Sequence, residues 1–159
     1  MQLPATLPDT TRVWIYQSNK PIPDQDVPGV RQKIRQFADR WVSHNQALHS
    51  FGDLWHNRFV ILMVDESQAG ASGCSIDSSV HFLKTLQAEY GIDLFDRMVF
   101  SFKQDGEVRS LNREEFSRWY QEGRITDDTL VFDTLVNTKK DLENDWVKPL
   151  SKSWHKRMV

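Results

Sequence analysis

The residue types most able to do chemistry in this sequence gather in one short segment, from Gly70 to His81. A loop of small residues, Gly70 to Ser75, leads into a helical pattern that carries the single cysteine, Cys74. The first turn of a helix has backbone N–H groups without intrahelical partners, and the helix dipole is positive there. Such a position favours a bound anion or a thiolate. We therefore predict that this loop and the helix start bind a small anionic ligand.

Each residue of this candidate site has a role that follows from its chemistry. Gly70 and Gly73 allow tight or left-handed backbone, so the loop amides can form a cradle. Ser72 and Ser75 supply hydroxyl donors, and Asp77 lies on the polar face of the helix. The predicted ligand-binding residues are Gly70, Ser72, Gly73, Ser75 and Asp77. The loop also has a structural explanation, because Ser72 or Ser75 can cap the helix.

A second hypothesis is an enzyme or redox protein in which Cys74 is the reactive thiol, with His81 as the nearest candidate base on the same helix. Asp77 and His81 are four residues apart and can touch across one turn. His81 is seven residues from Cys74, roughly 10 Å along a helix, too far for a direct hydrogen bond. A pairing therefore needs an irregular loop or another histidine, for which we expect His56. The plain alternative is a small buried cysteine, with Asp77 and His81 on a solvated face.

Composition and charge limit the class of protein. The chain has 159 residues, 39% of them hydrophobic and 26% charged, which suits one globular domain over residues 1–159. A net charge of -2 gives no basic field for nucleic acid. The single cysteine excludes an internal disulfide, and the first residues do not resemble a signal peptide. The longest apolar run, Phe59 to Val64, is too short to cross a bilayer, so we expect a cytoplasmic protein without membrane contact.

The sequence carries no signal for a bound metal or cofactor. The five histidines are scattered, and no spacing of cysteine and histidine is typical of zinc. We therefore predict no metal and no cofactor.

Periodicity and turn signals predict the elements that position the candidate site. Helices are predicted from Val27, with Asp26 and Pro28 as start signals, from about Ser75 to Tyr90 with Gly91 as a left-handed cap, from Asn112 to Gly123, and from Asn137 or Thr138 towards Pro149. Strands are predicted at Val13–Tyr16, Phe59–Val64, Met98–Lys103, Glu107–Leu111 and Thr129–Val136. Because Phe59 to Val64 is continuously apolar, we expect a central strand covered on both faces.

This order of elements predicts an α+β fold with a mixed sheet of about five strands and helices packed on it. The connection from Val13 to Val64 is long enough for a right-handed crossover between parallel strands. The Asp105-Gly106 turn instead requires an antiparallel hairpin. Residues 1–11 are expected to form a surface arm and residues 151–159 a solvated basic tail.

Three segments carry a resemblance to a known family: Trp14 to Ser18, Val64 to Asp77, and Asp93 to Arg97. Over nearly the whole chain, the sequence resembles a family of short bacterial proteins that often carry the label ABC transporter ATPase. Asp65-Glu66 after the apolar run looks like the Walker B acids of nucleotide hydrolases, but the same acids can end a strand in water. The sequence has no Walker A loop, so a true ABC-type ATPase is not expected and no ATPase residues are carried over.

A third hypothesis is a non-catalytic interaction or accessory module that uses exposed aromatic surface, including as a homo-oligomer. The chain has six tryptophans, at positions 14, 41, 55, 119, 146 and 154. Most of these are expected in the core, because they fall in helical or strand patterns. The hypothesis predicts a buried intermolecular patch and no ligand-sized pocket.

Overall fold

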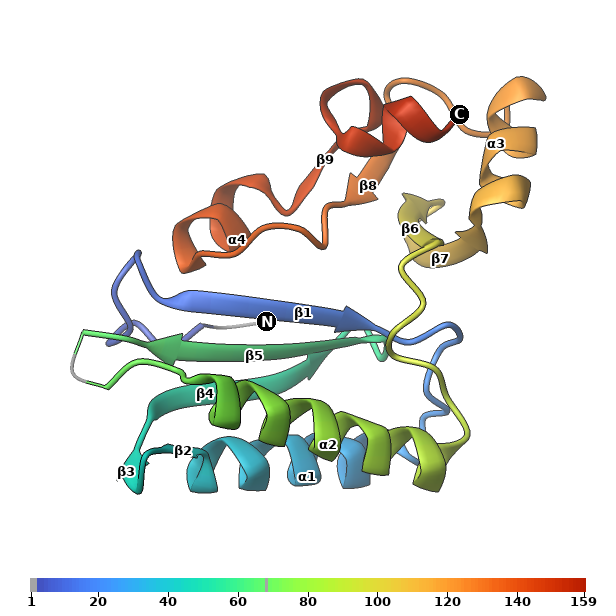
Figure 1. Ribbon diagram of the computed structural model, residues 1–159. Helices are drawn as coiled ribbons and strands as arrows, with labels where there is room; N and C mark the ends of the chain where they lie inside the picture. Colours follow the sequence, from blue (N-terminus) through green and yellow to red (C-terminus); the bar gives the residue numbers. More distant parts are fainter. Residues whose placement is uncertain (1–2, 68) are drawn as a thin grey trace.

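The computed structural model describes residues 3–67 and 69–159 and shows an α+β fold (Figure 1). The helices are α1 (Val27–Arg40), α2 (Gly73–Tyr90), α3 (Arg113–Gln121) and α4 (Lys139–Asp145), with the 3₁₀ turns η1 (Leu150–Lys152) and η2 (Trp154–Met158). The strands are β1 (Arg12–Gln17), β2 (Val42–Ser43), β3 (Gln46–Ala47), β4 (His49–Trp55), β5 (Phe59–Asp65), β6 (Val99–Gln104), β7 (Glu107–Asn112), β8 (Leu130–Phe132) and β9 (Val147–Pro149).

The strands form three separate sheets in which every pair is antiparallel, so the expected single mixed sheet of about five strands is wrong. The sheets have the orders β1-β5-β4, β2-β3 and β7-β6-β8-β9. The sequence patterns locate individual strands, but the pairing of strands that are distant along the chain depends on tertiary packing. Three strands before β5, namely β2, β3 and β4, also went unpredicted, and they change how the chain reaches β5.

The central strand β5 confirms the expectation of a strand covered on both faces. Its residues from Phe59 to Val64 are all buried. Side chains alternate across a strand, so Val60, Leu62 and Val64 pack in the core with α1 and α2. Phe59, Ile61 and Met63 pack in a second core with the C-terminal half of the chain. Figure 1 shows α1 and α2 on one side of this sheet and the C-terminal half of the chain on the other.

The expected crossover between the first strand and β5 is wrong, because β1 and β5 are antiparallel. The helix α1 leads instead into β4, which returns to β5 through a tight hairpin. In that turn His56 and Asn57 both have positive φ, 54° and 55°. Because β1 and β4 both run antiparallel to β5, they are parallel to each other, and α1 connects these two outer strands.

A glycine in β4 allows α1 to pack closely on the sheet. A Cβ atom at Gly52 would lie 2.9 Å from Ile34 Cγ2 and 3.2 Å from the Ile34 carbonyl oxygen. Gly52 and the following Asp53 both have low strand propensity, so the sequence pattern does not reveal β4. Gly52 therefore weakens the strand pattern in the sequence, and the same glycine is required for the close packing of α1 on β4.

Local predictions of helix ends and turns are confirmed. The α2 helix ends at Gly91 with a left-handed φ of 63°, and Asn112 caps α3 by accepting the Glu115 N–H. Thr138 caps α4. The turn between β6 and β7 has positive φ at Asp105 and Gly106, as the hairpin signal indicated. Capping and turn chemistry acts within a few residues, so it can be read from the sequence.

Both ends of the described chain pack more tightly than the sequence indicated. In the expected arm, Leu7 is buried against the core formed with β1 and β5. In the expected solvated tail, residues 151–159, His155 is only 2% exposed, and Trp154 packs against the core of β6 and α3. None of the helices in the described part of the chain combines the length and the apolar character that crossing a bilayer requires.

Candidate functional site

Several N–H groups of the predicted loop already have partners in neighbouring residues of the chain. The Ser72 N–H donates to Ser75 Oγ at 2.6 Å, and the Ser75 N–H donates to Ser72 Oγ at 3.2 Å, which forms a capping box. The Ala71 N–H donates to Glu66 Oε2 at 2.9 Å. A Cβ atom at Gly70 would lie 3.0 Å from the same oxygen. A carboxylate of the protein thus lies against the loop where an anion was predicted.

The first turns of α2 divide into exposed and buried residues. Gly73, Cys74, Asp77 and His81 are exposed, so the alternative of a buried cysteine is wrong. Ser75 is only 2% exposed, and its carbonyl accepts the Trp41 indole N–H at 2.8 Å. The predicted polar face of α2 therefore exists, whereas Ser75, which was predicted to bind the ligand, is buried and has a structural role. Ligand binding by the loop and reactivity of Cys74 stay predictions.

We expected His56 near the candidate loop, but the histidine at the carboxyl end of β5 is His49. Its Nδ1 lies 3.2 Å from Asp65 Oδ2. The Ser67 N–H, donated to the Asp65 carboxylate, and the nearby His49 lower the pKa of Asp65. His56 lies at the opposite end of β5, in the β4–β5 turn, where its ring packs on Phe59, Phe132 and Trp146. Burial lowers the pKa of His56.

The two acids that resemble Walker B residues are engaged by neighbouring groups. Asp65 accepts the Ser67 N–H, and Glu66 accepts the Ala71 N–H and lies 3.7 Å from Arg12. Over residues 3–67 and 69–159, no group of three or more His, Cys, Asp or Glu side chains is placed to hold a metal ion.

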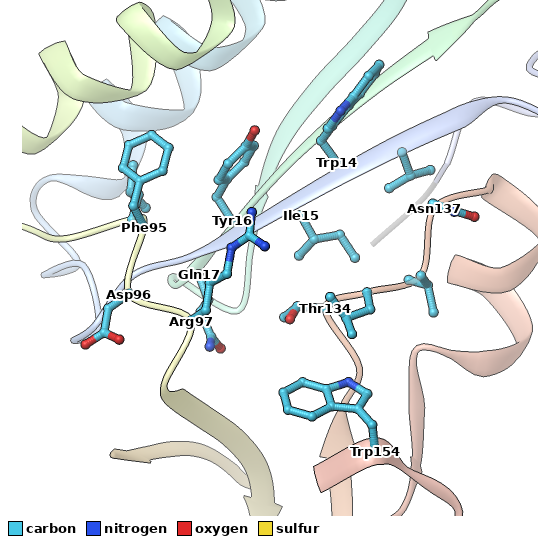
Figure 2. Close-up of a pocket in the computed structure, with 14 residues that line it drawn as sticks. Trp14, Ile15, Tyr16, Gln17, Phe95, Asp96, Arg97, Thr134, Asn137 and Trp154 are labelled. Atoms are coloured by element: carbon cyan, nitrogen blue, oxygen red, sulfur yellow. The ribbon is translucent and has the colours of Figure 1, made fainter. Parts of the chain in front are cut away.

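A groove along the outer edge of β1 offers a different site, which we call the β1 groove (Figure 2). It has a volume of about 240 Å³. Its lining comes from four parts of the chain, namely Val13–Gln17, Leu94–Arg97, Thr134–Asn137 and Trp154. No single segment of the sequence contains this site.

The floor of the β1 groove is the outer edge of a sheet strand. The N–H of Val13 donates outward to the Asn137 carbonyl at 2.9 Å. In an antiparallel strand alternate residues face the same way, so Ile15 and Gln17 also turn their main-chain groups outward. Within the described residues no acceptor bonds the Ile15 N–H. The pairing on this side of β1 thus ends at Val13, and the groove begins there.

The opposite edge of the same sheet is covered. Along β4, the Arg31 guanidinium donates to the Leu54 carbonyl at 2.9 Å. The Leu54 N–H donates to Asp53 Oδ1 at 2.8 Å. Side chains that bond edge groups prevent another strand from adding to a sheet. In the described residues, the β4 edge is thus bonded by side chains at Leu54, whereas the β1 edge faces the groove at Ile15.

Aromatic side chains form the walls of the β1 groove. Tyr16 and Phe95 contact edge to face, with their ring centroids 5.5 Å apart. Burial raises the pKa of Tyr16, which keeps its hydroxyl neutral. On the far wall, the Trp154 indole donates to Asp133 Oδ1 at 2.9 Å and stacks on His155 at 3.8 Å. Leu135, which is 61% exposed, adds further apolar surface.

One cation in the β1 groove has no acidic partner. In Figure 2 the Arg97 side chain points towards Tyr16, whereas Asp96 points away from the groove. Asp96 accepts the Met98 N–H at 2.9 Å. Arg97 forms no salt bridge with the residues that the structure describes. A guanidinium in this position fits a carboxylate in two-point geometry.

A buried chain of hydrogen bonds fixes the end of the groove floor to the second sheet. Ser101 Oγ donates to Gln17 Oε1 at 2.7 Å, and the Gln17 amide donates to the Val99 carbonyl. Ser101 also bonds Ser110 at 2.7 Å, which accepts from Arg58 at 2.6 Å. The groove therefore has a rigid base at Gln17, shared between β1 and β6.

The sequence pattern does not predict this groove, although one signal lies in its lining. Trp14–Ser18 and Asp93–Arg97 are two of the three segments that carry the family resemblance, and residues of both line the groove. Comparison of this chain with family models, curated proteins and solved structures found no match. The family resemblance stays a prediction, and the geometry supplies the argument for function.

Proposed function

We propose that this protein is a non-catalytic binding module that takes an extended acidic peptide segment along the outer edge of β1. The observation that carries this proposal is the unpaired edge of β1 inside an apolar groove. A bound segment adds a strand to the sheet through main-chain hydrogen bonds to Ile15 and Gln17. This mode of binding needs no reactive group.

The lining of the groove indicates the chemistry of the segment. Residues of an added strand alternate between two faces, so one side of it meets Tyr16 and Phe95 and the other meets Leu135 and Trp154. Apolar residues suit both walls. The unpaired Arg97 selects an aspartate or glutamate. Because the groove holds only about 240 Å³, we expect recognition of a short stretch.

The groove has better support than the loop that was predicted first. At Gly70–Ser75 the donors of Ser72 and Ser75 bond within the loop, and Glu66 adds a negative charge beside them. Cys74 has no bonded histidine partner among the described residues. Along β1, by contrast, main-chain groups, apolar walls and one cation face the same space.

Selection from a random peptide-display library on the immobilised protein tests the proposal. We expect enrichment of peptides that have apolar residues on both faces of the extended strand and one Asp or Glu. NMR titration of a selected peptide should then shift the amide signals of Ile15 and Gln17. Arg97→Glu should weaken binding about tenfold or more, since a charge-assisted hydrogen bond is lost and a repulsion is added.

Two further variants make the result decisive. Ile15→Pro removes the outward N–H at an edge position that tolerates proline, and it should also weaken binding. Arg113→Glu reverses an exposed charge on α3 and should leave binding unchanged. A library without enriched peptides, or binding that is indifferent to both Arg97→Glu and Ile15→Pro, would refute the proposal.

A further inference from the structure

A second site begins with a buried arginine, Arg58, at the end of the β4–β5 turn. The positive φ angles of His56 and Asn57 close this turn, and the Arg58 N–H donates to the Trp55 carbonyl at 3.1 Å. The Arg58 carbonyl in turn accepts the Ser18 N–H at 2.7 Å. The backbone is thus fixed on both sides, and the residue is only 6% exposed.

The partners of the buried guanidinium are all neutral. It donates to Ser110 Oγ at 2.6 Å and to the Val108 carbonyl at 3.2 Å, both in β7. The Nε–H is buried and has no partner. Among the described residues no carboxylate forms a salt bridge with Arg58. Because a buried charge needs compensation, this arginine favours an anion close by.

Arg58 lies in the lining of an open pocket of about 850 Å³ between the β4–β5 turn and β7. Two exposed cations, Lys20 and Arg109, line the same pocket. Its acidic lining residue is Glu107, which is 73% exposed at its side chain and lies 3.8 Å from Arg109. Partial burial lowers the pKa of His56, which disfavours its charged form near neutral pH. The lining therefore has an excess of positive charge.

We propose that this pocket binds a phosphate group, either as free phosphate or as part of a small phosphorylated molecule. A guanidinium has five donors, and only two of those of Arg58 are used by Ser110 and Val108. Lys20 and Arg109 supply two further charges, which suits a dianion better than a single carboxylate. Trp119 also lines the pocket, where its ring can pack on an organic substituent.

NMR titration with inorganic phosphate tests this proposal on the full chain. The unpartnered Arg58 Nε–H provides a direct probe, and its signal should shift saturably together with the amides of Gly106–Ser110. The double variant Lys20→Ala with Arg109→Ala changes only exposed residues, so it should fold normally. We expect it to weaken phosphate binding about tenfold or more. Lys84→Ala, an exposed charge on α2, is the matched control and should have no effect.

Variants of Arg58 and a choice of ligands complete the test. Arg58→Gln should abolish binding, and Arg58→Lys should retain part of it, because the charge stays and the fork is lost. Phenyl phosphate that binds more tightly than phosphate and shifts the Trp119 indole signal identifies a phosphorylated molecule as the ligand. Equal or weaker binding of phenyl phosphate identifies free phosphate. If an Arg58 variant does not fold, the double variant still decides.

Three results would overturn the phosphate site. One is an equal response to sodium chloride at the same ionic strength, which indicates screening alone. Another is tighter binding of acetate than of phosphate. The third is saturable phosphate binding that the double variant leaves unchanged.

Discussion

The Gly70–Ser75 loop and the β1 groove lie beside two neighbouring strands of one sheet, yet they differ in what their polar groups do. In the loop, the N–H groups of Ser72 and Ser75 bond the side chains of the same two residues, and Glu66 bonds Ala71. Along β1, the outward N–H of Ile15 faces a groove. The loop N–H groups of Ala71, Ser72 and Ser75 thus have partners in the chain, whereas the Ile15 N–H has none among the described residues.

A strong signal in neighbouring residues of the sequence often reflects a local structural requirement rather than a binding site. Small residues and serines before a helix are typical of anion sites, but they are also what a helix cap requires. The β1 groove has no such signal, because its walls come from four parts of the chain. Separate variants can therefore disturb either region without the other.

The largest expected effect concerns the wall of the β1 groove. Burial lowers the pKa of His155 to about 4, whereas histidine in an unfolded chain titrates near 6.5. Between these two values the unfolded chain binds more protons, so the free energy of unfolding falls as pH falls through this window. The full loss is on the order of 3 kcal/mol at pH 4. Because Trp154 stacks on His155, peptide binding in the groove should weaken over the same range.

Urea unfolding at several pH values checks this prediction. The wild type should lose more stability between about pH 6.5 and pH 4 than His155→Gln, in which the titrating group is absent. His44→Gln, an exposed histidine, should follow the wild type. Parallel stability curves for the wild type and His155→Gln would show that the buried imidazole is not responsible.

A smaller effect is expected at the cap of α2. Ser72→Ala removes the acceptor of the Ser75 N–H and should lower the free energy of unfolding by about 1 kcal/mol. Peptide binding in the β1 groove should stay the same, because the two regions share no lining residue. Chemical denaturation and the peptide titration measure both quantities. A loss of peptide affinity without loss of stability would contradict the separation of the two regions. Ser78→Ala on the exposed face is the matched control.

The smallest effect is expected from modification of Cys74. Its exposure predicts that iodoacetamide alkylates it in the folded protein. Stability and peptide binding should change little, because the thiol takes no part in a core. Mass spectrometry follows the reaction. A rate far above that of a free thiol would revive the hypothesis of a reactive cysteine, and a thiol that does not react would contradict its exposure.

The sequence predicted more of the fold than of the site. Gly91, Asn112 and Asp105-Gly106 mark helix ends and a hairpin through interactions within a few residues, and all three predictions are confirmed. The strand β4 was missed, because Gly52 serves the packing of α1 and weakens the strand pattern. The sheet was predicted wrongly for a related reason, since strand pairing joins segments far apart in the chain.

The candidate sites show the same difference between local interactions, which the sequence predicts, and contacts between distant segments, which it does not. A capping serine such as Ser72 can be recognised because its partner, Ser75, is three residues away. Arg97 and Trp154 meet in one groove only because β1 and the C-terminal half of the chain pack together (Figure 2). Arg58 is an ordinary hairpin residue in the sequence, and it becomes a buried cation only where β7 covers it. Helix caps and turns depend on residues that are neighbours in the sequence, so the sequence determines them. The burial of a side chain and the meeting of distant side chains depend on contacts across the whole fold.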